Sequence, residues 1–318
     1  LLLLVDALFV GFLPNTVRAA VRSRYLGSHY GLPGRPTARL HIAVITRLDT
    51  DHGHTRQNFA AYCKRHNYDL VVLNDHSKHL RFESGFAMRP FGAVKRILQA
   101  PAFLDYKLYD WVLWADADTL FLNHGVPLER IIDTRYSFIV PSPLPEDADA
   151  VPSLSHFMVR NDRLGRQLLD DLDRRSQEHC GQFIVEYPGA GTALNGWLHI
   201  CNADGTFWNG DRGLLLAFLT FAPPDYRCRF KRIAHRVIDS QFPAYGQGDL
   251  ALSFPDYMSD HRKKLMAMIV ERADYSKGRI KSIDTANGQL DPVDPGLGDW
   301  RALEALYDAH LNVPCQDL

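Results

Sequence analysis

Short apolar runs alternate with helix-like segments in the first half of the chain. The runs at 41–46, 68–73 and 111–115 contain β-branched residues and are typical of buried strands. Between them, the segments 54–66 and 89–104 carry apolar positions at helical spacing, the second interrupted by a proline. Strand, helix, strand, helix, strand is the alternation of an α/β fold with a mostly parallel sheet flanked by helices.

The second half of the chain follows a looser pattern. It predicts strands at 136–140, 156–160 and 250–254, a loop at 141–152, and helices at 162–177, 212–221, 259–272 and 300–310. Residues 25–38 are rich in Gly and Pro and read as a linker. We therefore expect an N-terminal segment and linker at 1–38, one main domain at 39–275, and a C-terminal extension at 276–318.

The first thirteen residues are apolar apart from Asp6. A membrane-spanning helix needs roughly 20 apolar residues, so this run is short for a span. Two readings stay open: the remnant of a membrane anchor, or an apolar helix that packs on the domain. The first predicts a membrane-anchored protein, and the second leaves a cytoplasmic location open.

Composition narrows the class of partner. The 36 basic and 37 acidic residues give a net charge of -1, so no general field attracts nucleic acid or an anionic membrane. The five cysteines form no Cys-X-X-Cys pair, which argues against a structural zinc site. They fit a reduced compartment or one or two disulfides, with one bridge conceivable among Cys180, Cys201 and Cys228.

The clearest chemical signal is Asp116-Ala-Asp118, which follows the apolar strand at 111–115 directly. Two carboxylates one residue apart at a strand end can share a hard divalent cation, and such a cation can stabilise a leaving diphosphate. A solvated turn is the plain alternative, but the apolar residues on both sides make it a poor explanation. Ligands of α/β sheets also bind at the carboxyl ends of strands.

One rival enzyme class has a similar segment. Phosphatases of the haloacid dehalogenase type carry Asp-X-Asp-X-Thr after an apolar strand, whereas here Thr119 follows Asp118 directly. That reading predicts a phosphoaspartate at Asp116, and we rank it well below metal-assisted group transfer.

Several stretches resemble glycosyltransferase family 34, which includes galactosyl-, mannosyl- and xylosyltransferases. They occur in the family's order and cover roughly residues 40–260: Arg89-Pro-Phe-Gly-Ala-Val-Lys95, Trp114-Ala-Asp116-Ala-Asp118-Thr-Leu-Phe, Ser153-Leu-Ser-His-Phe-Met-Val-Arg160-Asn161, Asn209-Gly-Asp211-Arg212 and Gly248-Asp249-Leu-Ala-Leu-Ser253-Phe254. The resemblance implies a GT-A fold, the α/β fold of nucleotide-diphospho-sugar transferases. It also implies manganese or another divalent cation, and retention of anomeric configuration.

The resemblance also implies roles for individual residues. Asp116 is expected near the ribose and the metal, and Asp118 as a direct metal ligand. Thr46 is expected near the nucleotide base, and Lys95 and Arg160 near the diphosphate. A second set concerns the reacting sugar: Asp211 is expected to face it, with Arg212 orienting Asp211. A surface role for the two cations and a helix N-cap for Asp211 are the alternatives.

The chain departs from the family where a third metal ligand is expected. The family's His before Phe is Ser253 here, and its Asp-Gln is Asp211-Arg212. Either water completes the coordination, which we favour, or His261 reaches back from the start of the next helix. We therefore predict a retaining glycosyltransferase that moves a hexose or pentose from a nucleotide-diphosphate sugar to a glycan acceptor. The alternative is a catalytically silent GT-A domain that binds a nucleotide sugar or a glycan.

Overall fold

A computed structural model describes residues 39–48, 52–73, 89–99, 109–142, 152–187, 201–241, 249–254, 259–271, 273–274, 279–280 and 315. The first 38 residues, the linker within them, most of the loop at 141–152 and the predicted helix at 300–310 lie outside the described residues.

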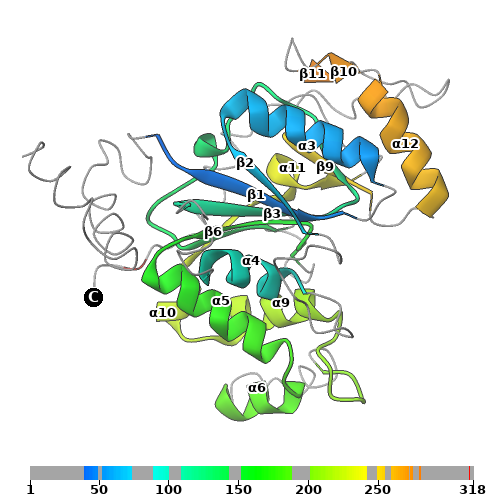
Figure 1. Cartoon of the computed structure of the whole chain (residues 1–318). Coiled ribbons are helices and arrows are strands. Elements are labelled where there is room, and N and C mark those ends of the chain that lie inside the picture. Colours follow the sequence, from blue (N-terminus) through cyan, green and yellow to red (C-terminus); the bar gives the residue numbers. More distant parts are fainter. Residues whose placement is uncertain are drawn as a thin grey trace, which may run out of the picture.

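A six-stranded sheet forms the centre of the molecule (Figure 1). Its strands are β1 (Ile42–Arg47), β2 (Asp69–Leu73), β3 (Trp111–Ala115), β5 (Phe138–Ser142), β6 (His156–Arg160) and β7 (Phe230–Ala234). They lie in the order β2-β1-β3-β6-β5-β7, and β6 runs antiparallel to both of its neighbours. The other three pairings are parallel, so the predicted mostly parallel sheet is confirmed.

Helices cover both faces of this sheet (Figure 1). One face carries α3 (Gly53–His66), α11 (His235–Ile238) and α12 (Ser259–Glu271), and the other carries α4 (Pro90–Gln99), α5 (Arg163–Arg175), α6 (Cys180–Glu186), α9 (Asp211–Phe221) and α10 (Pro224–Arg227). Each face buries its own apolar core, with Trp111 and Phe59 in one and Phe157 and Phe218 in the other. The α/β fold class predicted from the sequence, a mostly parallel sheet with helices on both sides, is confirmed.

A second, smaller sheet follows the end of β3 in the chain. It contains β4 (Thr119–Phe121), β8 (Ser240–Gln241) and β9 (Ala251–Ser253), with β9 in the middle. The remaining elements are the 3-10 turn η2 (Leu128–Arg130) and the short pair β10 (Ala273–Asp274) and β11 (Arg279–Ile280). Because β4 begins at Thr119, the Asp-Ala-Asp segment is the connection between the two sheets.

Two disulfides join distant parts of the chain. Cys180 pairs with Cys201, and Cys228 pairs with Cys315, while Cys63 is a buried free thiol. The sequence suggested one bridge among the first three of these cysteines, and the bridge to Cys315 was missed. Within the described residues, no helix has the length and apolar character that crossing a bilayer requires.

Candidate functional site

Asp116 is held in a fixed position at the end of β3. Its backbone N–H donates to the carbonyl of Ser155 at 2.9 Å, which extends the β3–β6 ladder by one residue. Its Oδ1 accepts a hydrogen bond from the indole Nε1 of Trp114 at 2.7 Å. The hydroxyl of Thr119 donates to the Asp116 carbonyl at 2.7 Å and closes the turn. The carboxylate is therefore oriented before any ligand arrives.

Asp118 lies on the outer side of the same turn. The hydroxyl of Thr55 in α3 donates to the carbonyl of Ala117 at 2.8 Å, and the backbone N–H of Phe254 donates to the carbonyl of Asp118 at 3.1 Å. Arg262 of α12 donates to the Asp118 carboxylate at 3.1 Å. Elements from both ends of the domain thus converge on this turn.

A pocket of about 380 Å³ opens over the two carboxylates. The described residues that line it are Arg47, His52, Pro90, Trp114, Asp116, Ala117, Asp118 and Arg262. They come from the carboxyl ends of β1 and β3 and from the starts of α3, α4 and α12. The chain passes from β1 to β2 on one side and returns to β3 on the other. Ligands of open α/β sheets bind at such a switch point.

The electrostatics of the pocket favour a bound cation. Burial and the nearby charge of Asp118 raise the pKa of Asp116 to about 8, although the Trp114 hydrogen bond and Arg212 act in the opposite direction. A divalent cation that coordinated both carboxylates would remove this repulsion. The guanidinium of Arg262 already forms an ion pair with the Asp118 carboxylate.

The described residues do not by themselves complete a cation site. Within the described residues, no group of three or more His, Cys, Asp or Glu side chains is placed to hold a metal. Two carboxylates on one pocket wall fit a cation whose other ligands come from water or from phosphate oxygens. The residues present therefore fit an ion that binds together with a phosphorylated ligand.

Thr46 and Arg47 are neighbours at the end of β1, and their side chains point to opposite faces of the strand. Thr46 is fully buried, and its hydroxyl has no hydrogen-bond partner among the described residues. Arg47, the next residue, lines the pocket, because successive side chains of a strand point to opposite faces. Sequence reasoning selected Thr46 and missed Arg47.

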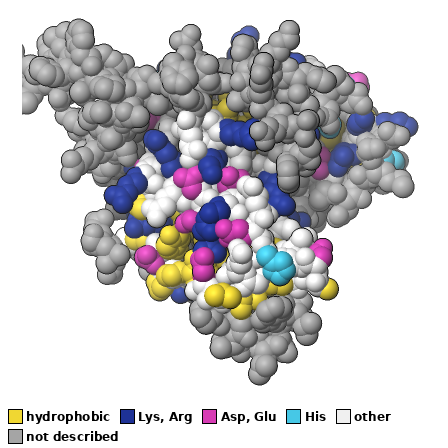
Figure 2. Space-filling view, turned by 60° about the horizontal axis from the view of Figure 1, so that its bottom comes forward, with side chains coloured by type: hydrophobic (Ala, Val, Ile, Leu, Met, Phe, Trp, Pro, Cys, Tyr) yellow, Lys and Arg dark blue, Asp and Glu magenta, His cyan; other side chains and the backbone are white. Residues whose placement is uncertain are grey.

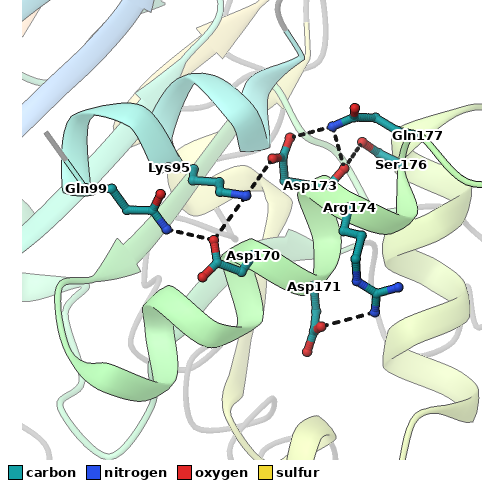
Figure 3. A network of polar contacts seen from close by, with 8 residues as sticks. All are labelled: Lys95, Gln99, Asp170, Asp171, Asp173, Arg174, Ser176 and Gln177. Carbon is teal, nitrogen blue, oxygen red and sulfur yellow. Dashed lines mark hydrogen bonds and ion pairs between the residues drawn. The ribbon is translucent and has the colours of Figure 1, made fainter.

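Lys95 does not reach the pocket. Its ammonium lies 3.0 Å from Asp173 and 3.2 Å from Asp170, both on α5 (Figure 3). Burial acts to lower the pKa of Lys95, but the two carboxylates raise it on balance. Basic and acidic side chains interleave on the side of the molecule that carries α4 and α5 (Figure 2). The expected diphosphate contact is corrected to a helix-to-helix ion pair.

Arg160 is also far from the carboxylates. The antiparallel register pairs Arg160 with Trp111 at the beginning of β3, whereas His156 pairs with Ala115 at its end. Four residues of strand correspond to roughly 13 Å. Arg160 instead donates to the carbonyl of Thr134 at 2.6 Å and lies 3.2 Å from Asp162. A diphosphate over Asp118 is out of its reach, and this expectation is corrected.

Asp211 and Arg212 do lie close to the pocket. Asp211 is the first residue of α9, and the N-cap position belongs to Gly210, so the capping alternative for Asp211 is wrong. Burial raises the pKa of Asp211, although Arg89 lies 3.1 Å from its carboxylate and acts to lower it. Arg212 donates through Nε to the carbonyl of Pro152 at 3.2 Å. Arg89, rather than Arg212, therefore orients Asp211.

Neither Ser253 nor His261 is among the described residues that line the pocket. Ser253 is buried in β9 opposite Thr119, and its hydroxyl donates to the carbonyl of Ser240 at 3.2 Å. It does not face the pocket, so a histidine there would overpack the small sheet. His261 is exposed, and Arg262 lines the pocket in its place. Neighbouring residues of a helix point about 100° apart, which explains the difference of one position.

The sequence did not predict the buried pair of His156 and Asp239. His156 Nδ1 lies 3.1 Å from the Asp239 carboxylate, and both side chains are fully buried. Burial acts to raise the pKa of Asp239, but His156, Ser153 and Ser253 lower it on balance. Only tertiary packing joins β6 to the end of α11, so no local signal identifies this pair.

Comparison with known proteins gives structural likenesses only. No protein-family model matches the chain, and no curated protein sequence matches it. A glycosyltransferase involved in glycosylating the major capsid of PBCV-1 is 13% identical, with a TM-score of 0.47 over 70% of this chain and 98% of that one. The galactosyltransferase LgtC, solved with donor and acceptor sugar analogues, is 10% identical, with a TM-score of 0.41 over 73% and 96%.

A third likeness is to the mannosyltransferase PcManGT from Pyrobaculum calidifontis, solved with GDP-Man and Mn2+. It is 14% identical, with a TM-score of 0.30 over 48% of this chain and 52% of that one. All three are glycosyltransferases. At these scores and identities the likeness carries no argument about substrate, and the chemistry below rests on the residues of this chain.

Proposed function

We propose that this protein is a metal-dependent, retaining glycosyltransferase that uses a nucleotide-diphosphate sugar. The observation that carries the proposal is the placement of Asp116 and Asp118 on one wall of a pocket at the switch point of the sheet. Two carboxylates and two arginines around one cavity match a ligand that combines a divalent cation with a diphosphate.

The residues around the pocket then have physical tasks. Asp118 and Asp116 hold the cation, which we propose to be manganese and which would offset negative charge on the departing diphosphate. Arg47 and Arg262 line the same pocket and would take the role at the diphosphate that Lys95 and Arg160 do not fill. Thr46, buried on the other face of β1 from Arg47, has no direct task in this proposal, and Asp211 lies towards the reacting sugar.

The transfer itself conserves the anomeric configuration. The bond between the anomeric carbon and the diphosphate oxygen breaks, and the acceptor oxygen bonds to that carbon on the same face. The acceptor's hydroxyl proton passes to the departing diphosphate. The reaction class extends to hexose or pentose donors and to glycan or glycoconjugate acceptors.

The alternative is a domain that binds a nucleotide sugar without transferring it. The observation in its favour is Ser253, whose burial leaves the cation one protein ligand short. Both proposals share the same pocket, so binding does not separate them but turnover does.

A thermal-shift screen of nucleotide sugars with manganese identifies the donor. A ligand that binds only the folded state stabilises it by ~2.7 kcal/mol at a hundredfold excess over its dissociation constant. The stabilising donor is then incubated with protein and manganese, without acceptor, and release of the nucleoside diphosphate is followed. Turnover that disappears in Asp118→Asn supports the enzyme. Stabilisation without turnover supports the silent domain, and no stabilisation by any donor rejects both.

The cellular location is a separate proposal. Four of the five cysteines are paired, and disulfides persist in oxidising compartments. This favours the lumen of the secretory pathway, where a lumenal Golgi enzyme works, over the cytoplasm. Thiol titration of the denatured, unreduced protein from its native source should find one free thiol, that of Cys63. Five free thiols would favour a cytoplasmic location.

A further inference from the structure

Trp208 is unusual among the large apolar side chains. It is 44% exposed, and among the described residues only it and Val185 are large hydrophobic residues left open to solvent. The neighbouring Phe207 is buried against Phe183, with ring centroids 5.7 Å apart. Phe207 therefore packs into the protein, whereas the next side chain, Trp208, stays exposed to solvent.

The loop that carries Trp208 is rigid. The Cys180–Cys201 disulfide ties its beginning to α6, and the backbone N–H of Cys180 donates to the carbonyl of Gly205 at 2.7 Å. Cys201 forms an isolated antiparallel bridge with Phe207. These contacts hold the backbone of the loop in place. The indole of Trp208 is therefore less able to fold back onto the protein surface.

The helix after the loop fixes Trp208 from the other side. A Cβ on Gly213 would lie 1.7 Å from the Trp208 carbonyl, so α9 packs directly against this residue. Asn209 and Gly210 have φ angles of 61° and 60°, a region that Asn and Gly adopt more readily than other residues, and the chain reverses there into α9.

Trp208 is also connected to the pocket by a short path. Asp211 follows Trp208 by three residues, which limits their Cα separation to roughly 10 Å. Asp211 pairs with Arg89 at 3.1 Å, and the next residue, Pro90, lines the pocket. Trp208 is therefore only three residues from the carboxylate that we propose to face the reacting sugar, where the acceptor must arrive.

We infer that Trp208 is the stacking platform for a pyranose ring of the acceptor. One face of a pyranose consists largely of C–H bonds and packs on a flat indole, while the hydroxyl edge stays available to polar neighbours such as the exposed Asn209. The inference rests on the proposed function and adds an acceptor subsite to it.

Fluorine NMR tests the platform without relying on activity. The protein is labelled with 5-fluorotryptophan, and the signal of Trp208 among the five tryptophans is identified by its loss in Trp208→Phe. Methyl α- and β-glycosides of glucose, galactose, mannose and xylose are then titrated, with and without manganese and the stabilising donor's nucleoside diphosphate. A saturable shift of the Trp208 signal supports the platform. No shift with any glycoside overturns it, as does a shift that depends on protein concentration alone, which would indicate a second copy on this surface.

Kinetics supply a second readout with a matched control. In Trp208→Ala the acceptor KM should rise by about 10-fold or more while donor hydrolysis without acceptor stays unchanged. Trp208→Phe should recover most of the loss, and Val185→Ala should have none. An unchanged acceptor KM in Trp208→Ala, with donor hydrolysis intact, rejects the platform and leaves the proposed function standing. Absence of donor hydrolysis in the parent protein rejects the enzyme, and the fluorine titration then still decides whether Trp208 binds glycosides.

Discussion

The guanidinium of Arg262 lies 3.1 Å from the Asp118 carboxylate, although 144 residues separate them in the chain. Each side chain is 24% exposed. An ion pair this open contributes on the order of 0–1 kcal/mol to stability, so fold stability is a weak reason for it. The pairing instead links α12 to the residue that we expect to bind the cation.

The first prediction concerns this link. Without Arg262, manganese no longer competes with a guanidinium for Asp118, but the diphosphate loses a charged partner. In Arg262→Ala we expect tighter manganese binding in the absence of nucleotide and about 10-fold weaker binding of the donor. Calorimetry measures both. Lys264→Ala, on the same helix and exposed, should change neither. An unaltered donor affinity in Arg262→Ala would mean that Arg262 does not contact the donor and serves only as the ion-pair partner of Asp118.

The second prediction concerns the charge of Asp118. Asp118→Asn keeps the shape of the side chain but removes a charge from the cation site. We expect transfer activity to fall by at least ~100-fold while the melting temperature changes little. Asp225→Asn removes an acidic charge from α10, which contributes no described residue to the pocket, and serves as the control. Parental activity in Asp118→Asn with manganese present would show that Asp118 is not a ligand.

The third prediction concerns pH. The pKa of Asp116 is about 8 in the fold against an ordinary value of 3.8, so the folded chain holds a proton that the unfolded chain releases. Stability from this group is therefore full at acid pH and declines as pH rises from about 4 to about 8. Melting temperatures of the metal-free protein across this window should fall more steeply than those of Asp116→Asn. Parallel curves would mean that Asp116 has an ordinary pKa.

The fourth prediction concerns Asp211. Because Gly210 occupies the N-cap, Asp211→Ser loses only the favourable position of an acid in the first helical turn and the partly exposed pair with Arg89. We expect a stability change of at most ~1 kcal/mol and loss of most transfer activity. Arg89→Ala breaks the same ion pair and leaves the Asp211 carboxylate in place. If both variants lose activity equally, the ion pair matters and the carboxylate has no separate role.

The fifth prediction concerns His261. Its side chain is exposed, while the adjacent Arg262 lines the pocket. We expect His261→Ala to bind manganese as tightly as the parent when the nucleoside diphosphate is present, because water completes the coordination. Asp118→Asn is the variant that should show the loss. Weakened manganese binding in His261→Ala, measured by calorimetry, would make this residue the third protein ligand.

The apolar pattern along the chain is enough to predict the centre of the sheet and the position of the two carboxylates. The predicted bounds of β3 and β6 coincide with the observed ones, because a strand buried on both faces reads as an apolar run. The run is unbroken in β3, and in β6 it lies between His156 and Arg160. Asp116 and Asp118 follow such a run, so their position at the strand end is a local property. The helix predicted from Asp162 is likewise local, since the Asp162 side chain caps α5 by accepting from the backbone N–H of Gly165.

The identity of the cations near the carboxylates depends on long-range packing that local sequence does not reveal. Lys95 and Arg160 precede and follow the motif in the chain, yet one pairs with α5 and the other lies at the far end of β6. β7 was missed for a related reason: its Lys231 looks solvent-exposed in sequence but is buried 3.6 Å from Asp133. A long charged side chain carries no local signal of its partner, because its energy depends on charges that folding brings near it.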